Sequence, residues 1–323
     1  MYLAPEGDEL EIASASGSFL ASAMPIARLH SPGSADMGPN LRRHLGEMGW
    51  FALIVPEDRG GSGLSSVEHV LFFREVGRQC GPVDVLAQAI AAASTADAGR
   101  RAALTSGEIG AALLIADGER HRLVGLPSAE IGLIIGDDAA SLVSLADARC
   151  EPRPSLDPAN SIGLIAACPP AVERSAGDTP WRLGQLGVAA MLLGLGEAAL
   201  DRIVEYATVR ETFGRPIGAY QAVRHPCAEM AVRLEAARAQ LWYAAAAWKE
   251  GRADAGAHVD AARHLASAAA MFCADTSIQL HGGIGVTEEH DCHLLLKHAM
   301  LLSRLFGTKR QLLSSLLHAR LEH

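Results

Sequence analysis

The residues best suited to chemistry lie between Arg210 and Gln221, in the stretch RETFGRPIGAYQ. Arg210 closes one helical pattern and Gln221 opens the next. Gly214 and Pro216 interrupt the helix between them, so an arginine, an aromatic residue and a glutamine meet around a tight turn. Because a guanidinium is a planar fork of donors, this corner suits a diphosphate. The competing interpretation is a plain helix–helix elbow whose arginine pairs with a surface acid.

A second group of reactive residue types occupies the nine residues from His290 to His298. On a helix His290 and His293 share a face, and an H-x-x-H pair can bind zinc. No second cluster stands at a useful spacing, so a polar helix start with ordinary histidines is the favoured interpretation, and no metal site is expected. The group consists of His290, Asp291, Cys292, His293 and His298.

Three motifs together resemble those of the acyl-CoA dehydrogenases, FAD enzymes that desaturate acyl-CoA thioesters. RETFGRPIGAYQ is similar to the family's R-x-x-F-G-x-x-I-x-x-x-Q, and IQLHGGIG at Ile278 to Gly285 is similar to its Q-x-x-G-G-x-G. GWFALIVPEDRGGSG at Gly49 to Gly63 is similar to an N-terminal motif of the family. The resemblance implies FAD as the cofactor. It assigns FAD binding to Arg210, Phe213, Gln221, Gln279, Gly282, Gly283 and Thr308.

The family's catalytic base is missing from both of its known positions. Removing the α-proton of a thioester needs a carboxylate against the α-carbon. Most members supply the glutamate of a Y-E-G-T-like motif, and here RLFGTKRQ places Phe306 at that position. Other members carry a glutamate followed by an arginine in the helix before the R-x-x-F-G turn, and those positions are Gly184 and Gln185 here. No catalytic base is therefore predicted in this chain by resemblance.

Three interpretations of this pattern remain open. In the first, the chain is the non-base subunit of a heteromeric enzyme whose paralogous subunit supplies the base, as in similar short subunits of bacterial α2β2 enzymes that shorten steroid side chains. In the second, it is a homo-oligomeric dehydrogenase with an atypical base, for which Glu288 and Glu289 are nearest in sequence. In the third, it is a non-catalytic assembly subunit. The resemblance implies an acyl-CoA substrate and an electron-transfer flavoprotein as further partners.

The elements that position these residues follow from the apolar pattern. Helical spacing over residues 10–32, 37–49 and 65–79 predicts a mainly helical N-terminal third. Short apolar runs from Ala111 to about Ala167 predict a small sheet of five or six strands, followed by a linker that includes Pro169 to Thr179. Where the family has a T-E-P-x-A-G-S-D-like segment that holds the flavin ring, this chain has Ile115 to Gly118, so the flavin cradle is expected to be incomplete.

The last part of the chain predicts a bundle of long helices. From Val223 to Trp248 apolar residues recur at steps of four and three, and smaller side chains repeat this pattern from Val259 to Cys273. Two further helices, at about 290–305 and 308–320, complete an antiparallel bundle. The predicted fold is mainly α and acyl-CoA dehydrogenase-like. It comprises a helical N-terminal domain (1–108), a reduced β domain with its linker (109–180) and a C-terminal four- or five-helix bundle (181–323).

Composition limits the compartment and the partners. With 323 residues the chain is long enough for two or three domains, and its formal net charge of -9 argues against nucleic acid. The longest charge-free apolar run, Leu183 to Gly196, has 14 residues and is too short for a membrane span. The acidic N-terminus does not resemble a secretory signal. Six cysteines without C-x-x-C spacing fit reduced thiols, so we expect a cytoplasmic protein that does not associate with membranes.

Overall fold

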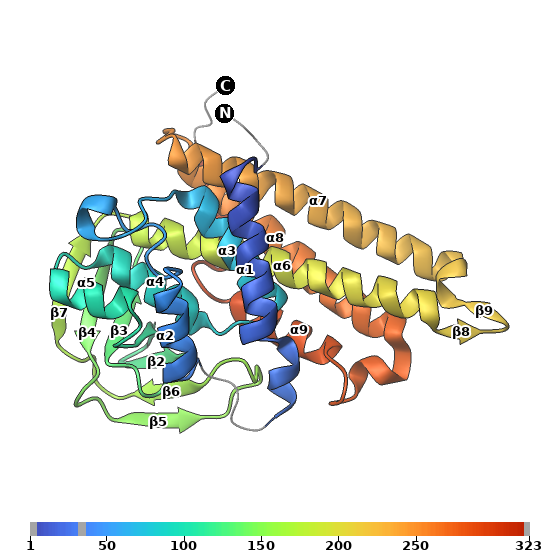
Figure 1. The fold of residues 1–323 in the computed structure, drawn as a ribbon, viewed down its shortest axis with the longest axis horizontal. Coiled ribbons are helices and arrows are strands. Elements are labelled where there is room, and N and C mark those ends of the chain that lie inside the picture. The colour runs from blue at the N-terminus through green and yellow to red at the C-terminus, as the bar shows by residue number, and fades with distance from the viewer. Residues whose placement is uncertain (1–4, 32–36, 320–323) are drawn as a thin grey trace. The chain divides into compact units, whose positions relative to one another are not determined.

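The structure is a computed structural model that describes residues 5–31 and 37–319 (Figure 1). It has the predicted mainly helical fold, with a seven-stranded sheet and a two-stranded one. The chain divides into two compact units, which we call the bundle unit and the sheet unit. The bundle unit comprises Met1–His30, Val70–Cys80 and Gln185–His323, and the sheet unit comprises Ser31–His69 and Gly81–Gly184. The predicted three-domain division at residues 108 and 180 stays a prediction.

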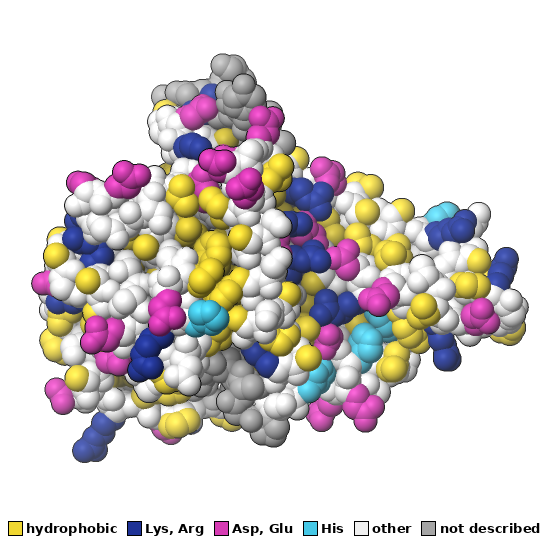
Figure 2. All heavy atoms as spheres, in the orientation of Figure 1, with side chains coloured by type: hydrophobic (Ala, Val, Ile, Leu, Met, Phe, Trp, Pro, Cys, Tyr) yellow, Lys and Arg dark blue, Asp and Glu magenta, His cyan; other side chains and the backbone are white. Residues whose placement is uncertain are grey.

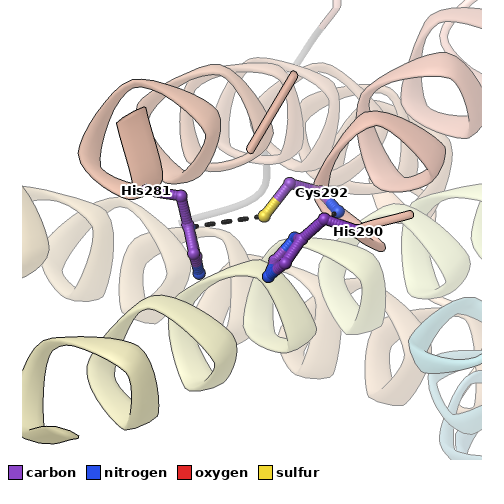
Figure 3. Close-up of side chains that lie close together, drawn as sticks. All are labelled: His281, His290 and Cys292. Atoms are coloured by element: carbon purple, nitrogen blue, oxygen red, sulfur yellow. Dashed lines mark hydrogen bonds between the residues drawn. The ribbon is translucent and has the colours of Figure 1, made fainter. Parts of the chain in front are cut away.

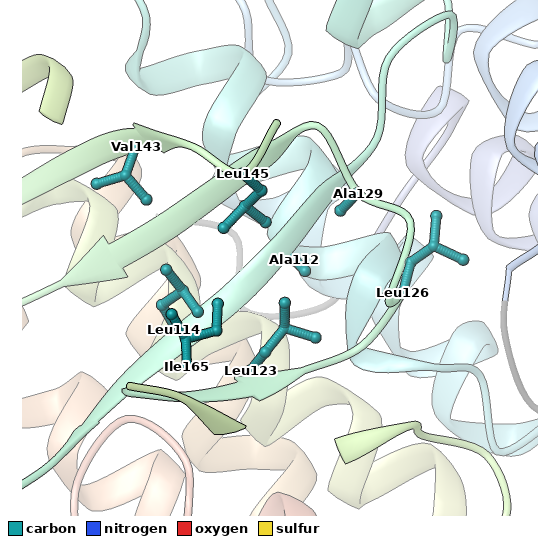
Figure 4. Packing of buried hydrophobic residues seen from close by; sticks show 8 residues of the cluster. All are labelled: Ala112, Leu114, Leu123, Leu126, Ala129, Val143, Leu145 and Ile165. Atoms are coloured by element: carbon teal, nitrogen blue, oxygen red, sulfur yellow. The ribbon is translucent and has the colours of Figure 1, made fainter. Parts of the chain in front are cut away.

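The sheet unit is built on seven strands in the order β5-β6-β2-β1-β3-β4-β7. β1 pairs in parallel with β3, and the other neighbouring pairs are antiparallel. Alternate apolar side chains of these strands form a small core, drawn in Figure 4, to which Leu114, Leu123 and Val143 belong. The strands are β1 Ala111–Asp117, β2 Arg120–Val124, β3 Ile131–Ile135, β4 Ala139–Ser144, β5 Cys150–Arg153, β6 Ile162–Ile165 and β7 Ala171–Ala176.

The sheet has one strand more than the five or six predicted, because β7 lies in the segment predicted as a linker and carries no apolar run. β5 and β7 have mostly exposed side chains, so their pairing rests on backbone hydrogen bonds that hydrophobic periodicity does not reveal. β7 occupies much of the predicted linker. Its Glu173 accepts hydrogen bonds from the Thr95 hydroxyl at 2.6 Å and from the Arg100 guanidinium at 2.6 Å. A polar segment is thus held in the sheet by charge-assisted hydrogen bonds.

Helices surround this sheet within its own unit. α4 is buried along most of its length, and its Asp84 carboxylate accepts the Leu126 amide at 2.7 Å. The helices of this unit are α2 Pro39–Glu47, η2 Glu57–Arg59, the start of α3 Ser66–Arg78, α4 Val83–Ser94, α5 Ala98–Thr105 and the start of α6 Thr179–Val209.

The bundle unit contains the long helices that the apolar stripes predicted. In α7 the stripe residues Met230, Leu234 and Leu241 are buried, and α8 contributes alanines and Cys273 to the same core. Small side chains let these helices approach closely. Besides the ends of α3 and α6, the unit holds α1 Asp8–Ala23, η1 Ile26–His30, α7 Gln221–Lys249, α8 Ala255–His281, η4 Gly282–Val286, α9 Cys292–Leu302 and α10 Lys309–His318.

A buried carboxylate joins three helices of the bundle unit. Glu197 on α6 is 4% exposed, and it accepts hydrogen bonds from Arg74 of α3 at 2.7 Å and from Arg238 of α7 at 2.8 Å. Each arginine balances part of the charge that burial would otherwise make costly. The network therefore fixes how α3, α6 and α7 pack against one another.

Two segments of the described chain are long and apolar enough to cross a membrane by length and composition. In α6, 94% of the most apolar window is buried inside the protein, so packing accounts for its apolar character. The window in Asp8–His30 is 22% buried, and the helix that begins there carries three acidic residues in its first turn.

Candidate functional site

The predicted corner is a tight hairpin at one end of the bundle unit. β8 (Glu211–Thr212) pairs with β9 (Arg215–Pro216), and Figure 1 shows this hairpin beyond the adjoining ends of α6 and α7. The turn residues Phe213 and Gly214 have positive φ values of 50° and 78°. A residue other than glycine rarely has a positive φ, so contacts around the turn must hold Phe213 in this conformation. As a result the Phe213 ring is 97% exposed and points away from the bundle core.

Arg210 keeps its guanidinium available at this corner. Within residues 5–31 and 37–319 no side chain pairs with it. Neighbouring groups rigidify the turn, since Arg215 stacks on the Tyr220 ring at 4.1 Å and the Tyr220 hydroxyl donates to the Thr212 carbonyl at 2.9 Å. A fixed turn thus presents an exposed, unpaired cation and the exposed Gln221 amide.

The remaining residues predicted to bind FAD lie where two other helices end or begin. Gln279 is exposed on the last turn of α8, and Gly282 and Gly283 follow in η4. A Cβ built on either glycine would meet no atom within 4 Å, so a ligand can approach the backbone closely there. Thr308 caps α10 and accepts the Gln311 amide at 3.3 Å.

These features fit the diphosphate and adenosine part of FAD. A free guanidinium, open glycine backbone and a helix N-terminus are groups that bind phosphate. All seven predicted residues are exposed in this chain. Ile115 to Gly118, where the resemblance places the family's flavin-ring segment, form the end of β1 and a tight turn into β2. The residues present therefore fit one portion of the cofactor.

One of the two positions that lack a base, Phe306, lies in the bundle unit next to Gln185. Phe306 is 7% exposed and has a φ of 52°, between the end of α9 and the start of α10. The side-chain amide of Gln185, on α6 directly after Gly184, donates to the Phe306 carbonyl oxygen at 3.3 Å. The two sequence motifs thus converge on one place in the fold, and neither contributes a carboxylate there.

A carboxylate that the motifs did not identify stands beside this place. Asp260 on α8 is 3% exposed, and its Oδ1 accepts the same Gln185 amide at 2.8 Å. Its Oδ2 accepts the Ser315 hydroxyl at 2.6 Å. The only signal in the sequence is an acidic residue inside the apolar stripe of α8, directly after Val259. Glu289, one of the predicted alternatives, instead lines a surface cavity with His281 and His290.

In the structure His290 and His293, which were predicted to share a face, contact different partners. His290 stacks with His281 of α8 at a ring separation of 4.6 Å, whereas His293 lies 6.3 Å from His30. Burial lowers the pKa of His281 and His290 and raises the pKa of the Cys292 thiol. The rings are therefore neutral and the sulfur protonated near neutral pH. The H-x-x-H pair proposed from spacing is not the pair that the structure brings together.

Comparison with known proteins identifies two family models along the chain. Residues 8–102 match "Acyl-CoA dehydrogenase, N-terminal domain", and residues 181–320 match "Acyl-CoA dehydrogenase, C-terminal domain". Acyl-CoA dehydrogenase FadE34 of Mycobacterium tuberculosis is 33% identical over 288 residues, which cover 83% of this chain and 40% of FadE34. Acyl-CoA dehydrogenase IpdE2 of the same organism is 32% identical over 282 residues, which cover 84% of this chain and 83% of IpdE2.

Solved structures share the fold at lower sequence identity. The ChsE4-ChsE5 complex from Mycobacterium tuberculosis contains a chain with a TM-score of 0.82 and 22% identity, covering 99% of this chain and 100% of that chain. The structure of PigA with FAD and proline has a TM-score of 0.84 and 16% identity, covering 98% of both chains. These likenesses extend over both units of the present chain.

Proposed function

Because this chain belongs to the acyl-CoA dehydrogenase family, whose cofactor is FAD, we propose that it is the subunit of a heteromeric acyl-CoA dehydrogenase that does not supply the catalytic base. The reaction is the α,β-desaturation of an acyl-CoA thioester. A paralogous subunit contributes the base and the flavin-ring cradle, and an electron-transfer flavoprotein reoxidises the cofactor. The six unpaired cysteines suit the reducing cytoplasm, where we place the enzyme.

The observation that carries this proposal is the missing carboxylate at both known base positions, Phe306 and Gly184. Desaturation needs a base within hydrogen-bonding reach of the α-proton. Phe306 cannot accept a proton, and the neutral Gln185 amide is occupied by the Phe306 carbonyl and by Asp260. A second chain that carries the family's catalytic glutamate would explain why this chain keeps the family's fold but has no base.

Exposure of the predicted FAD residues supports a shared site. Arg210 and Gln221 flank the β8–β9 turn, and Gly283 lies in a turn with free space around its Cα. A neighbouring chain can therefore cover all three residues. Bound FAD would accept the hydride that leaves the β-carbon. Arg210 would neutralise diphosphate charge, and the open backbone at Gly282 and Gly283 would allow close approach. The named ChsE4-ChsE5 complex is a precedent in this fold for assembly from two different chains.

Asp260 favours a second candidate, a homo-oligomeric dehydrogenase with an atypical base. Its carboxylate shares the Gln185 amide with the Phe306 carbonyl, so it lies one side chain away from the usual base position. Both carboxylate oxygens are already hydrogen-bonded, however, and the Ser315 and Gln185 donors hold the group away from a substrate. The first candidate therefore accounts for more of the geometry.

Turnover of three variants in the complete two-subunit complex tests the proposal. Phe306→Ala is expected to retain turnover within about twofold, because the residue takes no proton, whereas replacing the partner's catalytic glutamate by glutamine should abolish it. Asp260→Asn preserves the shape and should also leave turnover nearly unchanged. A large loss with Asp260→Asn, together with turnover that survives without the partner's glutamate, would establish the second candidate instead.

The same chain without a partner provides the complementary test. Phe306→Glu restores a carboxylate at the base position but does not restore the flavin cradle. This variant alone is therefore expected to show no desaturation of acyl-CoA. Appreciable desaturation by the isolated Phe306→Glu protein would show that the chain had lost only its base.

A further inference from the structure

Two histidines and a cysteine converge beside the glycine turn that follows α8. His281 is the last residue of α8, His290 precedes α9, and Cys292 begins α9. The η4 turn folds the chain back between them, so that a ring nitrogen from each histidine and the Cys292 sulfur lie within 4.8 Å of one another (Figure 3). We call these three residues the His–Cys cluster. Two histidines and a thiol form a typical ligand set for a borderline divalent metal ion.

The protonation of His281 is set by a backbone carbonyl. Its Nδ1 lies 2.7 Å from the Ser277 carbonyl oxygen, which can only accept, so Nδ1 carries the proton and Nε2 carries the lone pair. The residue is 5% exposed, and among the described residues Nε2 has no hydrogen-bond partner. A buried acceptor without a partner is unfavourable. Donation of the other ring N–H to a carbonyl is how metal-binding histidines are usually oriented.

The other two members are held loosely enough to accept an ion. The Cys292 sulfur is fully buried, and its hydrogen-bond contacts among the described residues are long, at 3.4 Å to His281 Nδ1 and 3.5 Å to the Ser277 hydroxyl. His290 Nδ1 accepts the Cys292 amide at 3.2 Å, a contact that a metal ion at this nitrogen would replace. The Tyr206 ring also packs against the His281 ring, with the ring centres 4.6 Å apart.

A cavity of about 620 Å³ opens beside the cluster, and several acidic groups line it. Figure 2 shows histidine, acidic and basic side chains together on this part of the surface. Among the described residues, Arg202 is the one lysine or arginine that lines the cavity, and the Asp291 carboxylate lies 3.1 Å from it and neutralises it. The same carboxylate accepts His30 at 2.7 Å. Asp201 is paired with Arg78, so Glu205 and Glu289 are the acids that leave the wall negative and favourable to a cation.

We propose that His281, His290 and Cys292 bind one zinc ion, with the fourth coordination position open to the acidic cavity and filled by water or by Glu289. The thiol would lose its proton on binding, as zinc-bound cysteines do. Nitrogen and sulfur ligands exclude magnesium and calcium, which require oxygen. The bound ion would tie the end of α8 to the start of α9 and thereby fix the Gly282–Gly283 turn between them.

Cobalt binding to the reduced, chelator-treated full-length protein tests this site directly. Co²⁺ replaces zinc in tetrahedral sites and gives a thiolate-to-cobalt charge-transfer absorption when sulfur is a ligand. We expect one equivalent of Co²⁺ to saturate that absorption and one equivalent of Zn²⁺ to abolish it. Absence of the absorption, or saturation only at a large excess of Co²⁺, would overturn the proposal.

Matched variants assign the absorption to the cluster. Cys292→Ser should remove the charge-transfer band. The control is Cys273→Ser, which replaces a fully buried cysteine of α8 outside the cluster and should retain the band. His290→Gln, at a half-buried position where folding is less at risk, should weaken Co²⁺ binding at least tenfold. Zn²⁺ should raise the Tm of the wild type and leave that of His290→Gln unchanged. An undiminished band in Cys292→Ser or unchanged affinity in His290→Gln would refute the assignment.

Discussion

At the level of single residues, Arg210 and Gln221 are the side chains on which the predicted FAD contact depends most. Arg210→Ala or Gln221→Ala should lower the FAD occupancy of the assembled complex without unfolding it. Losing a charge-assisted hydrogen bond costs roughly 1.5–3 kcal/mol, so about a tenfold or greater loss of affinity is expected for Arg210→Ala. Flavin absorbance per complex, measured across a range of FAD concentrations, gives the affinity.

A control for this pair is Arg153→Ala, which removes an exposed arginine whose carboxylate partner is Glu151 at 3.0 Å. It changes the charge by the same amount but lies on β5 of the sheet unit, so FAD affinity should be unaffected. Equal flavin content in wild type, Arg210→Ala and Gln221→Ala would mean that the corner serves only to join two helices.

His69 on α3 makes the stability of the fold dependent on pH. Its ring is 1% exposed and its Nε2 lies 3.0 Å from the Leu183 carbonyl, within the sheet unit. Burial lowers the pKa of His69 from 6.5 to about 4. Because the unfolded chain binds a proton below about pH 6.5 and the folded chain does not until about pH 4, stability falls as the pH decreases through this window. The loss approaches about 3 kcal/mol at its acid end.

Urea unfolding of wild type and His69→Gln at several pH values measures this contribution. Glutamine can donate to the Leu183 carbonyl but cannot titrate, so the variant should lose less stability between about pH 7 and about pH 4.5. Burial also lowers the pKa of His264, His281, His290 and His293, and those groups remain in both proteins. The difference between the two proteins therefore isolates His69, and identical pH profiles would contradict its buried neutral state.

At the level of elements, the contact of α3 with α6 depends on glycine. A Cβ built on Gly194 of α6 would collide with the Arg74 carbonyl oxygen of α3, which is backbone and cannot turn away. Gly194→Ala should therefore destabilise the protein by about 1–2 kcal/mol, after about 1 kcal/mol of gained helix propensity is subtracted from the overpacking cost. Urea unfolding measures the difference.

Gly17→Ala on α1 is the matched helical control. Its Cβ would meet only the flexible end of the Glu75 side chain, at 3.1 Å, so the gain in helix propensity should dominate and stability should rise by up to about 1 kcal/mol. If both substitutions changed stability in the same direction, close backbone approach would not be what Gly194 provides.

The elements that the sequence predicted best are those whose hydrophobic pattern matches their burial. The stripe from Met230 to Leu241 identified α7, and the Gly282–Gly283 stop located the end of α8. The strand β7 was missed because an exposed edge strand is stabilised by backbone pairing and by ionic contacts such as that of Glu173, which leave no apolar period.

The site was predictable only where a motif is local. The corner around Arg210 and the turn at Gly283 could be found because each is a continuous stretch with its own turn residues. Asp260 could not be found, since its relation to Phe306 arises from α8 packing beside Gln185 of α6. The same limit applies to the His–Cys cluster, where the partner of His290 is His281 on another helix rather than His293 in the same segment.

At the level of the whole molecule, we propose that the chain holds one portion of a flavin site and has no carboxylate at either known base position. It matches the family's N-terminal and C-terminal domains, and its sheet begins with the β1–β2 hairpin where the resemblance places the flavin-ring segment. Such a chain is expected to bind FAD well only when a second subunit completes the site, because the energy of binding is distributed over both portions of the cofactor.

Flavin stoichiometry is the measurement that tests this central claim most directly. The chain is expressed alone and together with a full-length paralogous dehydrogenase, and FAD per chain is determined from absorbance after gel filtration in FAD-containing and FAD-free buffer. We predict little retained FAD for the chain alone and stoichiometric FAD for the co-purified complex. Stoichiometric yellow protein obtained from the chain alone would contradict the proposal that its flavin site is completed by another subunit.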